Sequence, residues 1–287
     1  MSAQEWILLV MQASIMISVV GIGLEARLDD ALYLLRQPWL FVRSLLAMFV
    51  VVPLAAIVLV KVFDFHRAVE IAIVALALSP VPPLLTRKQA KAGARSSYGL
   101  GLMVTMAILS IVVVPVGIHL LSSVFDRTLS LPPIEVAKLV AKSVFLPLAL
   151  GMVARRVFPG LAMRVARPVA ILGFGLLVAV SVLILVASER AVLGVLGDGT
   201  LPALLAFIVA GLVAGHWLGG PEPADRAVLG LSTASRHPGI AMAMASFNFP
   251  GEPGVPAAFL LYLLLNLVVS IPYVRWQRGR NRGDSQV

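Results

Sequence analysis

Nine long apolar segments, separated by short polar loops, dominate this sequence of 287 residues. A segment of 19 residues reaches about 28 Å as an α-helix, which is enough to cross the hydrocarbon core of a bilayer. The composition agrees, since 60% of the residues are hydrophobic, 13% are charged, and the mean hydropathy is +0.98. We therefore expect an all-α integral membrane protein with nine spans, near residues 6–24, 39–61, 68–93, 99–121, 135–156, 168–188, 200–218, 226–248 and 256–274.

The composition also excludes several classes of protein. The chain contains no cysteine, so disulfides and thiolate metal sites are ruled out. Its net charge is +9, but the basic residues lie in short loops between apolar spans, which favours a topology signal over nucleic-acid binding. No Gly-x-Ser-x-Gly, His-Glu-x-x-His, P-loop or dinucleotide-binding motif occurs, so we expect neither an enzyme nor a bound cofactor or metal. Glu5 and the lack of a basic region before it favour a retained first span over a cleaved signal peptide.

Lysine and arginine are distributed unevenly over the predicted loops. With the N-terminus outside, the inner segments hold 15 of them and the outer segments four, namely Lys61, Arg67, Arg127 and Arg190. The positive-inside rule then places the C-terminus in the cytoplasm. No loop is long enough for a soluble domain, so we expect residues 1–287 to form one transmembrane domain, in a bacterial inner (plasma) membrane. The basic segment 275–287 is predicted to be a cytoplasmic tail, disordered or lying near anionic lipid.

The eighth predicted span contains a break. Arg236 and His237 lie directly before Pro238, which cannot donate a helical N–H, and before Gly239, which weakens the helix further. Charged residues at membrane depth are costly and indicate a functional site. Non-helical backbone at that depth is tolerated only against protein or a water-filled cavity, and secondary transporters use such broken helices to hold substrates and ions. This pattern therefore predicts a membrane carrier.

The third predicted span has a similar break. Pro80, Pro82 and Pro83 lie within four positions, and two adjacent cations, Arg87 and Lys88, follow them. Spans three and eight occupy corresponding places in two groups, spans two to four and spans seven to nine. This arrangement predicts inverted repeats whose broken helices cross near the midplane of the membrane.

At this point the chain resembles the bile acid:sodium symporter family, whose members move organic anions together with sodium. The segment 142–151 is similar to the family's Lys-x-x-x-x-Pro-x-x-x-Gly span, 238–247 is similar to its second crossover helix, and Asn266 lies where a last-span asparagine is usual. The resemblance implies a nine-span form with a panel, at residues 6–24 and 135–188, and a core, at residues 39–121 and 200–274.

The positions that resemble the family's sodium ligands carry different residues in this chain. Ser232, Arg236 and His237 stand where the second crossover has glutamate, glutamine and asparagine. Arg87 and Lys88 align with the serine and asparagine of the first crossover. The other ligand positions read Gly101, Met48 and Thr105. Because sodium requires several oxygen ligands and no adjacent cation, we expect a fixed guanidinium to replace it and transport to proceed without sodium.

Two interpretations of these residues stay open. Arg236 can bind a substrate carboxylate, helped by the positive end of the following half-helix, or it can bond to carbonyls freed at the break. His237 can carry a coupled proton, and Arg87 and Lys88 either line the site or lie at the cytoplasmic surface. The predicted substrate-binding residues are Arg236, His237, Ser232, Thr105, Arg87, Lys88 and Asn266, and the predicted helix-break residues are Pro80, Pro82, Pro83, Pro238 and Gly239.

The sequence therefore predicts a secondary active transporter that carries a small organic anion across the lipid bilayer by alternating access, without sodium. Two alternatives stay open: a conventional sodium-coupled symporter and a non-transporting membrane scaffold or sensor. The coupling ion, whether a proton or sodium, also stays open.

Overall fold

The computed structural model describes residues 3–123, 129–187, 189–197, 199–252 and 254–283, and every regular element in these ranges is helical. Helices suit an apolar chain because they satisfy the backbone polar groups within each segment. The α-helices are α1 (Ala3–Glu25), α2 (Leu28–Ala31), α3 (Pro38–Leu45), α4 (Val52–Val62), α5 (Arg67–Leu78), α6 (Leu85–Lys91), α7 (Ser96–Leu120), α8 (Pro133–Val140), α9 (Leu146–Val157), α10 (Pro159–Ala187), α11 (Glu189–Val195), α12 (Thr200–Leu218), α13 (Pro223–Ala234), α14 (Pro238–Asn248) and α15 (Val255–Gly283). Short 3-10 turns cover Leu34–Arg36 and Leu121–Ser123.

Two long helices contain a π-helical turn close to a proline. The turn Leu46–Val51 joins α3 to α4, and the turn Ala141–Phe145 joins α8 to α9. Pro53 and Pro147 follow these turns and lack the N–H that a regular helix would use, so the wider turn accommodates each proline without ending the helix. The segments 38–62 and 133–157 are therefore continuous helices of 25 residues each.

Within the described ranges, six helices are long and apolar enough to cross a membrane, and they confirm the prediction of an all-α integral membrane protein. They are Pro38–Val62, Ser96–Leu120, Pro133–Val157, Pro159–Ile184, Thr200–Leu218 and Val255–Arg280. The apolar part of α1, Leu9–Glu25, is shorter, and so are the halves of each broken helix. The count of nine spans and the inverted repeat therefore stay predictions.

Two of the predicted boundaries differ from the structure. The span predicted to begin at residue 168 begins with α10 at Pro159, and Pro168 lies inside the helix. Neighbouring groups can satisfy the carbonyl that an interior proline frees, so proline does not have to start a membrane helix. In addition, α15 continues through Arg275 to Gly283, so the described part of the predicted tail is helical where a disordered segment had been one expectation.

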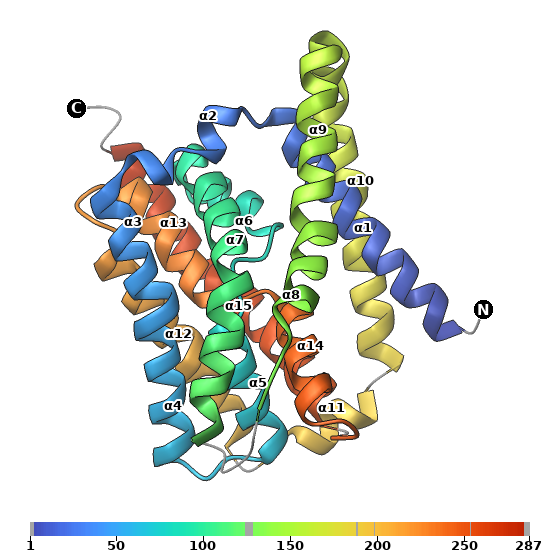
Figure 1. The fold of residues 1–287 in the computed structure, drawn as a ribbon, viewed down its shortest axis with the longest axis vertical. Helices are drawn as coiled ribbons and strands as arrows, with labels where there is room; N and C mark the ends of the chain where they lie inside the picture. Colours follow the sequence, from blue (N-terminus) through green and yellow to red (C-terminus); the bar gives the residue numbers. More distant parts are fainter. Residues whose placement is uncertain (1–2, 124–128, 188, 198, 253, 284–287) are drawn as a thin grey trace.

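The two broken helices meet inside the protein. Segment 79–84 separates α5 from α6, and segment 235–237 separates α13 from α14. The backbone N–H of His237 donates to the carbonyl of Pro80 at 2.9 Å. Helix α5 also packs against α14, and α6 packs against α13, so the four halves form one group; α13 and α14 run diagonally through it in Figure 1.

Helices α1, α9 and α10 lie together on the other side of the molecule, at the right of Figure 1. Small residues allow α1 to approach both partners closely. A Cβ added to Gly21 would lie 2.7 Å from the Cβ of Ala170, and one added to Gly23 would lie 2.9 Å from the Cα of Gly151. Close backbone approach through small residues is the usual basis of helix association in lipid. This group coincides with the predicted panel, although the division into two domains stays a prediction.

Candidate functional site

The first break is rich in hydrogen-bond acceptors. Three prolines, Pro80, Pro82 and Pro83, lack backbone N–H groups, so α5 ends at Leu78 and the chain becomes extended at Ser79. The hydroxyl of Ser79 donates to the carbonyl of Leu76 at 2.8 Å, which satisfies one acceptor at the end of α5. The carbonyls of Ser79 and Pro80 remain available to the second break.

The second break is shaped by His237. This residue is the N-cap of α14, and its Nδ1 accepts a hydrogen bond from the backbone N–H of Ile240 at 3.4 Å. Pro238 occupies the first helical position, where its missing N–H costs nothing. A Cβ on Gly239 would lie only 3.2 Å from Cε1 of His237, so glycine leaves room for the capping imidazole. Because Nδ1 accepts, the geometry favours a neutral ring with its proton on Nε2.

The guanidinium of Arg236 joins the second break to two other segments. Its Nη1 donates to the carbonyl of Ser79 at 3.1 Å, and its Nη2 donates to the carbonyl of Met48 at 2.7 Å. Nη1 also lies 3.5 Å from the sulfur of Met48. Arg236 is 1% exposed and is the largest of the fully buried side chains in the described residues. Its charge is therefore held by backbone carbonyls.

The carbonyl of Met48 is available because of the π turn before Pro53. In this turn the N–H of Val52 donates to the carbonyl of Ala47, five residues earlier. The next bond in the same pattern would join residue 53 to the carbonyl of Met48, but a proline has no N–H to donate. Pro53 therefore frees the backbone oxygen that Arg236 contacts.

One face of α15 completes the second break. Tyr262 and Asn266 are one turn apart, and both donate to the carbonyl of Ala234, at 2.7 Å from the hydroxyl and 2.8 Å from Nδ2. The hydroxyl of Tyr262 also accepts the backbone N–H of Arg236 at 2.8 Å, and Oδ1 of Asn266 accepts the hydroxyl of Ser235 at 3.0 Å. The polar groups that the break frees thus find partners on α15.

The structure separates the two cations that follow the first break. Nζ of Lys88 donates to Oδ1 of Asn266 at 2.8 Å and to the hydroxyl of Ser270 at 3.0 Å, so Lys88 belongs to the same polar cluster as the second break. The guanidinium of Arg87 lies over the ring of Phe174 in α10, 5.5 Å from its centroid. Arg87 therefore makes a cation–π contact with the α1–α9–α10 group instead of joining the cluster.

Ser232 and Thr105 are both buried but differ in their partners. The hydroxyl of Ser232 accepts a hydrogen bond from Nε2 of Gln89 at 2.9 Å, and Gln89 also donates to the carbonyl of Val228. The hydroxyl of Thr105 has no partner among the described residues. Gln89 was not among the predicted site residues, although its position directly after Lys88 places it on the same short helix α6.

No carboxylate in the described ranges forms an ion pair with Arg236 or Lys88. The ion pairs that the structure describes lie elsewhere, at Arg36–Asp29, Arg67–Glu252, Arg95–Asp225 and Lys138–Glu135. Glu70 lies in the first turn of α5, and its charged neighbours are Asp64, Arg67 and Lys61. Among the described residues, the partners of the two cations in the cluster are therefore dipoles alone.

Two buried donors at the crossing have no partner in the described part of the chain. They are Nε of Arg236 and Nε2 of His237, the latter on a side chain that is 6% exposed. Both adjoin the N-terminus of α14, where the first backbone N–H groups point out of the helix and favour negative charge. Such donors favour negatively charged ligands. Among the residues that the structure describes, no group of three or more histidine, aspartate and glutamate side chains could hold a metal ion.

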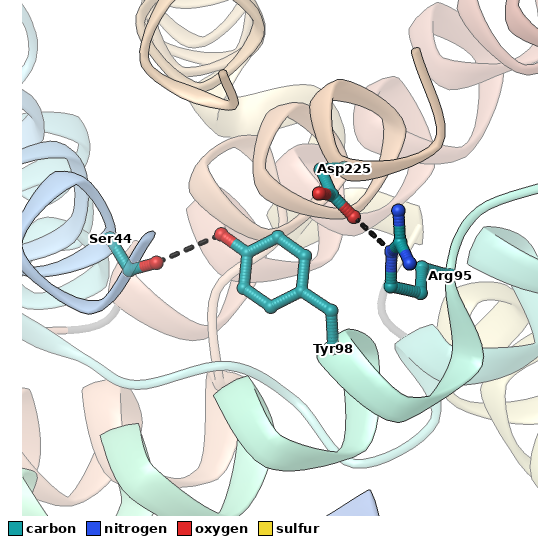
Figure 2. A network of polar contacts seen from close by, with 4 residues as sticks. All are labelled: Ser44, Arg95, Tyr98 and Asp225. Carbon is teal, nitrogen blue, oxygen red and sulfur yellow. Dashed lines mark hydrogen bonds and ion pairs between the residues drawn. The ribbon is translucent and has the colours of Figure 1, made fainter. Parts of the chain in front are cut away.

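A second polar network lies where α13 begins, and Figure 2 shows it. Nε of Arg95 donates to Asp225 in the first turn of α13 at 2.6 Å, and the hydroxyls of Ser44 and Tyr98 lie 2.8 Å apart. The hydrogen bond to Asp225 raises the pKa of Arg95, which favours the charged form of the guanidinium. The other broken helix begins with Arg67, whose Nε lies 3.7 Å from Glu252. An ion pair thus connects the first turn of α5 to the loop after α14, and another connects the first turn of α13 to the loop after α6.

Comparison with known proteins gives one family. The model of the sodium bile acid symporter family matches residues 10–194, which include the first break but not the second. No curated protein matches the chain.

Proposed function

The chain belongs to the sodium bile acid symporter family and is a membrane transporter of that kind, and from this premise we propose that it carries a small organic anion by alternating access without sodium. The observation that carries the proposal is the position of the Arg236 guanidinium, 2.7 Å from the carbonyl of Met48 and 3.1 Å from that of Ser79. A sodium ion is held by oxygen ligands such as these carbonyls. In this protein a covalently attached cation uses them.

Lys88 supports the same proposal at a second position. Its ammonium group contacts the side-chain oxygens of Asn266 and Ser270, and oxygens of this kind also suit sodium. Two fixed cations next to the two breaks would repel a third positive charge at short range. We infer that both cations perform the electrostatic role that sodium has in a coupled symporter.

The substrate anion, in this proposal, binds at the crossing through the donors that remain free. Arg236 offers Nε, His237 offers Nε2, and the α14 N-terminus adds its dipole, while Thr105 and Ser232 contribute hydroxyls. His237 acts as a neutral donor because its Nδ1 caps α14. This role argues against His237 as the carrier of a coupled proton.

The test is uptake by purified protein in lipid vesicles, with radiolabelled acetate, benzoate and cholate as separate probes. The vesicles are preloaded with the same unlabelled anion, and the outer buffer contains sodium, potassium or choline as its only cation. We expect equal uptake of at least one probe in all three buffers. A steep dependence on sodium would instead establish a conventional sodium-coupled symporter, and no uptake of any probe would favour a scaffold or sensor.

A further inference from the structure

We propose that this transporter is an anion exchanger: the inward movement of one organic anion requires the outward movement of another. The inference rests on the proposed function and specifies the second partner in transport, which is an anion of the same class on the opposite side of the membrane. Its basis is the pair of cationic side chains, Arg236 and Lys88, which are covalently attached to the chain and cannot leave with the substrate.

The two cations are connected through residues of α15. Asn266 connects them, since its Oδ1 accepts Nζ of Lys88 and the hydroxyl of Ser235, while its Nδ2 bonds to the carbonyl of Ala234. Tyr262 bonds to the same carbonyl and accepts the backbone N–H of Arg236. Lys88 and Arg236 thus belong to one hydrogen-bonded cluster around the second break.

The empty carrier keeps the cationic side chains of the cluster. None of the acids in the described ranges pairs with either cation. The hydrogen-bond partners of the two cations are carbonyl, amide and hydroxyl oxygens and the sulfur of Met48. In a sodium symporter the positive charge enters and leaves with the ion, so the empty protein returns without it. In this protein both cationic side chains stay. In the empty carrier only the dipoles of their hydrogen-bond partners among the described residues offset their charge in the low-dielectric core of the membrane.

In the loaded carrier, the bound anion offsets the positive charge of the cluster. A bound carboxylate supplies the negative charge that the cluster lacks, and this charge moves together with Arg236 and Lys88. The barrier for conversion between the outward-open and inward-open forms is therefore lower with an anion bound than without one. A carrier that converts mainly in its loaded form exchanges one anion for another.

The experiment compares the two directions of loading in sodium-free vesicles. Radiolabelled acetate, benzoate and cholate are presented outside, and the interior contains either phosphate buffer alone or the same unlabelled anion. Potassium and valinomycin hold the membrane potential at zero. For each probe that is taken up, we expect initial uptake at least about tenfold faster into preloaded vesicles, a factor that corresponds to about 1.4 kcal/mol.

The outcomes separate this inference from the proposed function. Equal rates with both interiors would overturn exchange and leave a sodium-independent anion carrier in place. No uptake of any probe with either interior would overturn the proposed function itself. Faster uptake into preloaded vesicles supports both.

A charge-removing variant tests the cause of the exchange. Lys88→Gln keeps a hydrogen-bond donor for Asn266 but removes one resident charge, so the ratio of preloaded to empty uptake should fall several-fold. Lys138→Gln is the matched control, because Lys138 is exposed and pairs with Glu135, away from the cluster; its ratio should equal that of the unmodified protein. If a folded Lys88→Gln variant has the same ratio of preloaded to empty uptake as the unmodified protein, the charge of Lys88 does not cause the exchange. Whether the protein is an exchanger at all is decided separately, by the ratio measured for the unmodified protein.

Discussion

The break between α5 and α6 contains three prolines, whereas the break between α13 and α14 contains an arginine and a histidine directly before its single proline. The first break presents carbonyls, and the second presents the N–H groups that bond to them: Arg236 to Ser79 and His237 to Pro80. The two breaks are therefore complementary in hydrogen bonding, one accepting and the other donating.

This difference explains why the crossing does not need an ion. Two breaks that both presented acceptors would leave oxygens facing one another, and a cation would have to lie between them. Here the second break carries its own cation on the side chain of Arg236, and the partners of that cation come from the first break and from Met48. Substitutions that change the donors, the acceptors or the ion pairs of the two breaks should therefore differ in their effect.

Replacing Arg236 should have the largest effect, because this side chain is the charged donor of the second break. Arg236→Ala should abolish binding of the anion. Arg236→Lys keeps the charge but loses the forked geometry, so affinity should fall by about ten- to 150-fold, equivalent to about 1.5–3 kcal/mol for one charged hydrogen bond. Isothermal titration of purified protein with the transported probe measures both values. If an Arg236→Ala protein binds the anion normally but has a lower melting temperature, the arginine stabilises the fold and does not bind the anion.

Replacing Pro53 should have a smaller effect, because it removes an acceptor of Arg236 without changing a side chain of the cluster. Pro53→Ala restores an N–H, so the carbonyl of Met48 gains a partner within its own helix and competes less well for Arg236. We expect vesicle uptake to fall by about tenfold, as for the partial loss of one charged hydrogen bond.

The second π turn provides the control for Pro53. Pro147→Ala restores an N–H after the turn Ala141–Phe145, whose described hydrogen bonds do not include Arg236. Uptake by this variant should stay close to that of the unmodified protein. Equal losses in both variants would show that the π turns matter for helix shape and not for the acceptor at Met48.

The ion pairs at the starts of the broken helices should give the smallest effects, and the two pairs should differ. Asp225 is 12% exposed and lies 2.6 Å from Arg95, whereas Glu252 is 26% exposed and lies 3.7 Å from Arg67. Asp225→Asn should destabilise the protein by about 1–2 kcal/mol, and Glu252→Gln by less than about 0.5 kcal/mol, because solvent screens the longer pair. Melting temperatures in detergent test the order, and a larger loss in Glu252→Gln would contradict it.

Much of the fold follows from the sequence, because hydropathy and proline act locally. Apolar runs predict the long helices, and the prolines at 80, 82, 83 and 238 predict where two of them break. The continuation of α15 beyond residue 275 was not predicted, since a run of arginines is compatible with both helix and coil.

The site is less predictable, because its contacts join segments that are far apart in the chain. The resemblance identified Lys88, Arg236 and Asn266 as candidates, and the structure brings Lys88 to Asn266. The resemblance could not identify Gln89 or Tyr262 as hydrogen-bond partners, since neither residue type is unusual in a helix. A methionine at position 48 gives no sign of an acceptor, because the group that Arg236 contacts is the backbone carbonyl.

The polar face of α15 places a limit on how this helix can change in length. Tyr262, Asn266 and Ser270 recur every four residues, so their contacts depend on a single helical phase. One residue inserted between Tyr262 and Asn266 would turn the rest of α15 by about 100° around its axis. The span would remain equally hydrophobic, yet Asn266 would no longer face Ala234 and Lys88. Hydrogen bonding, more than the thickness of the bilayer, therefore determines which insertions and deletions this helix tolerates.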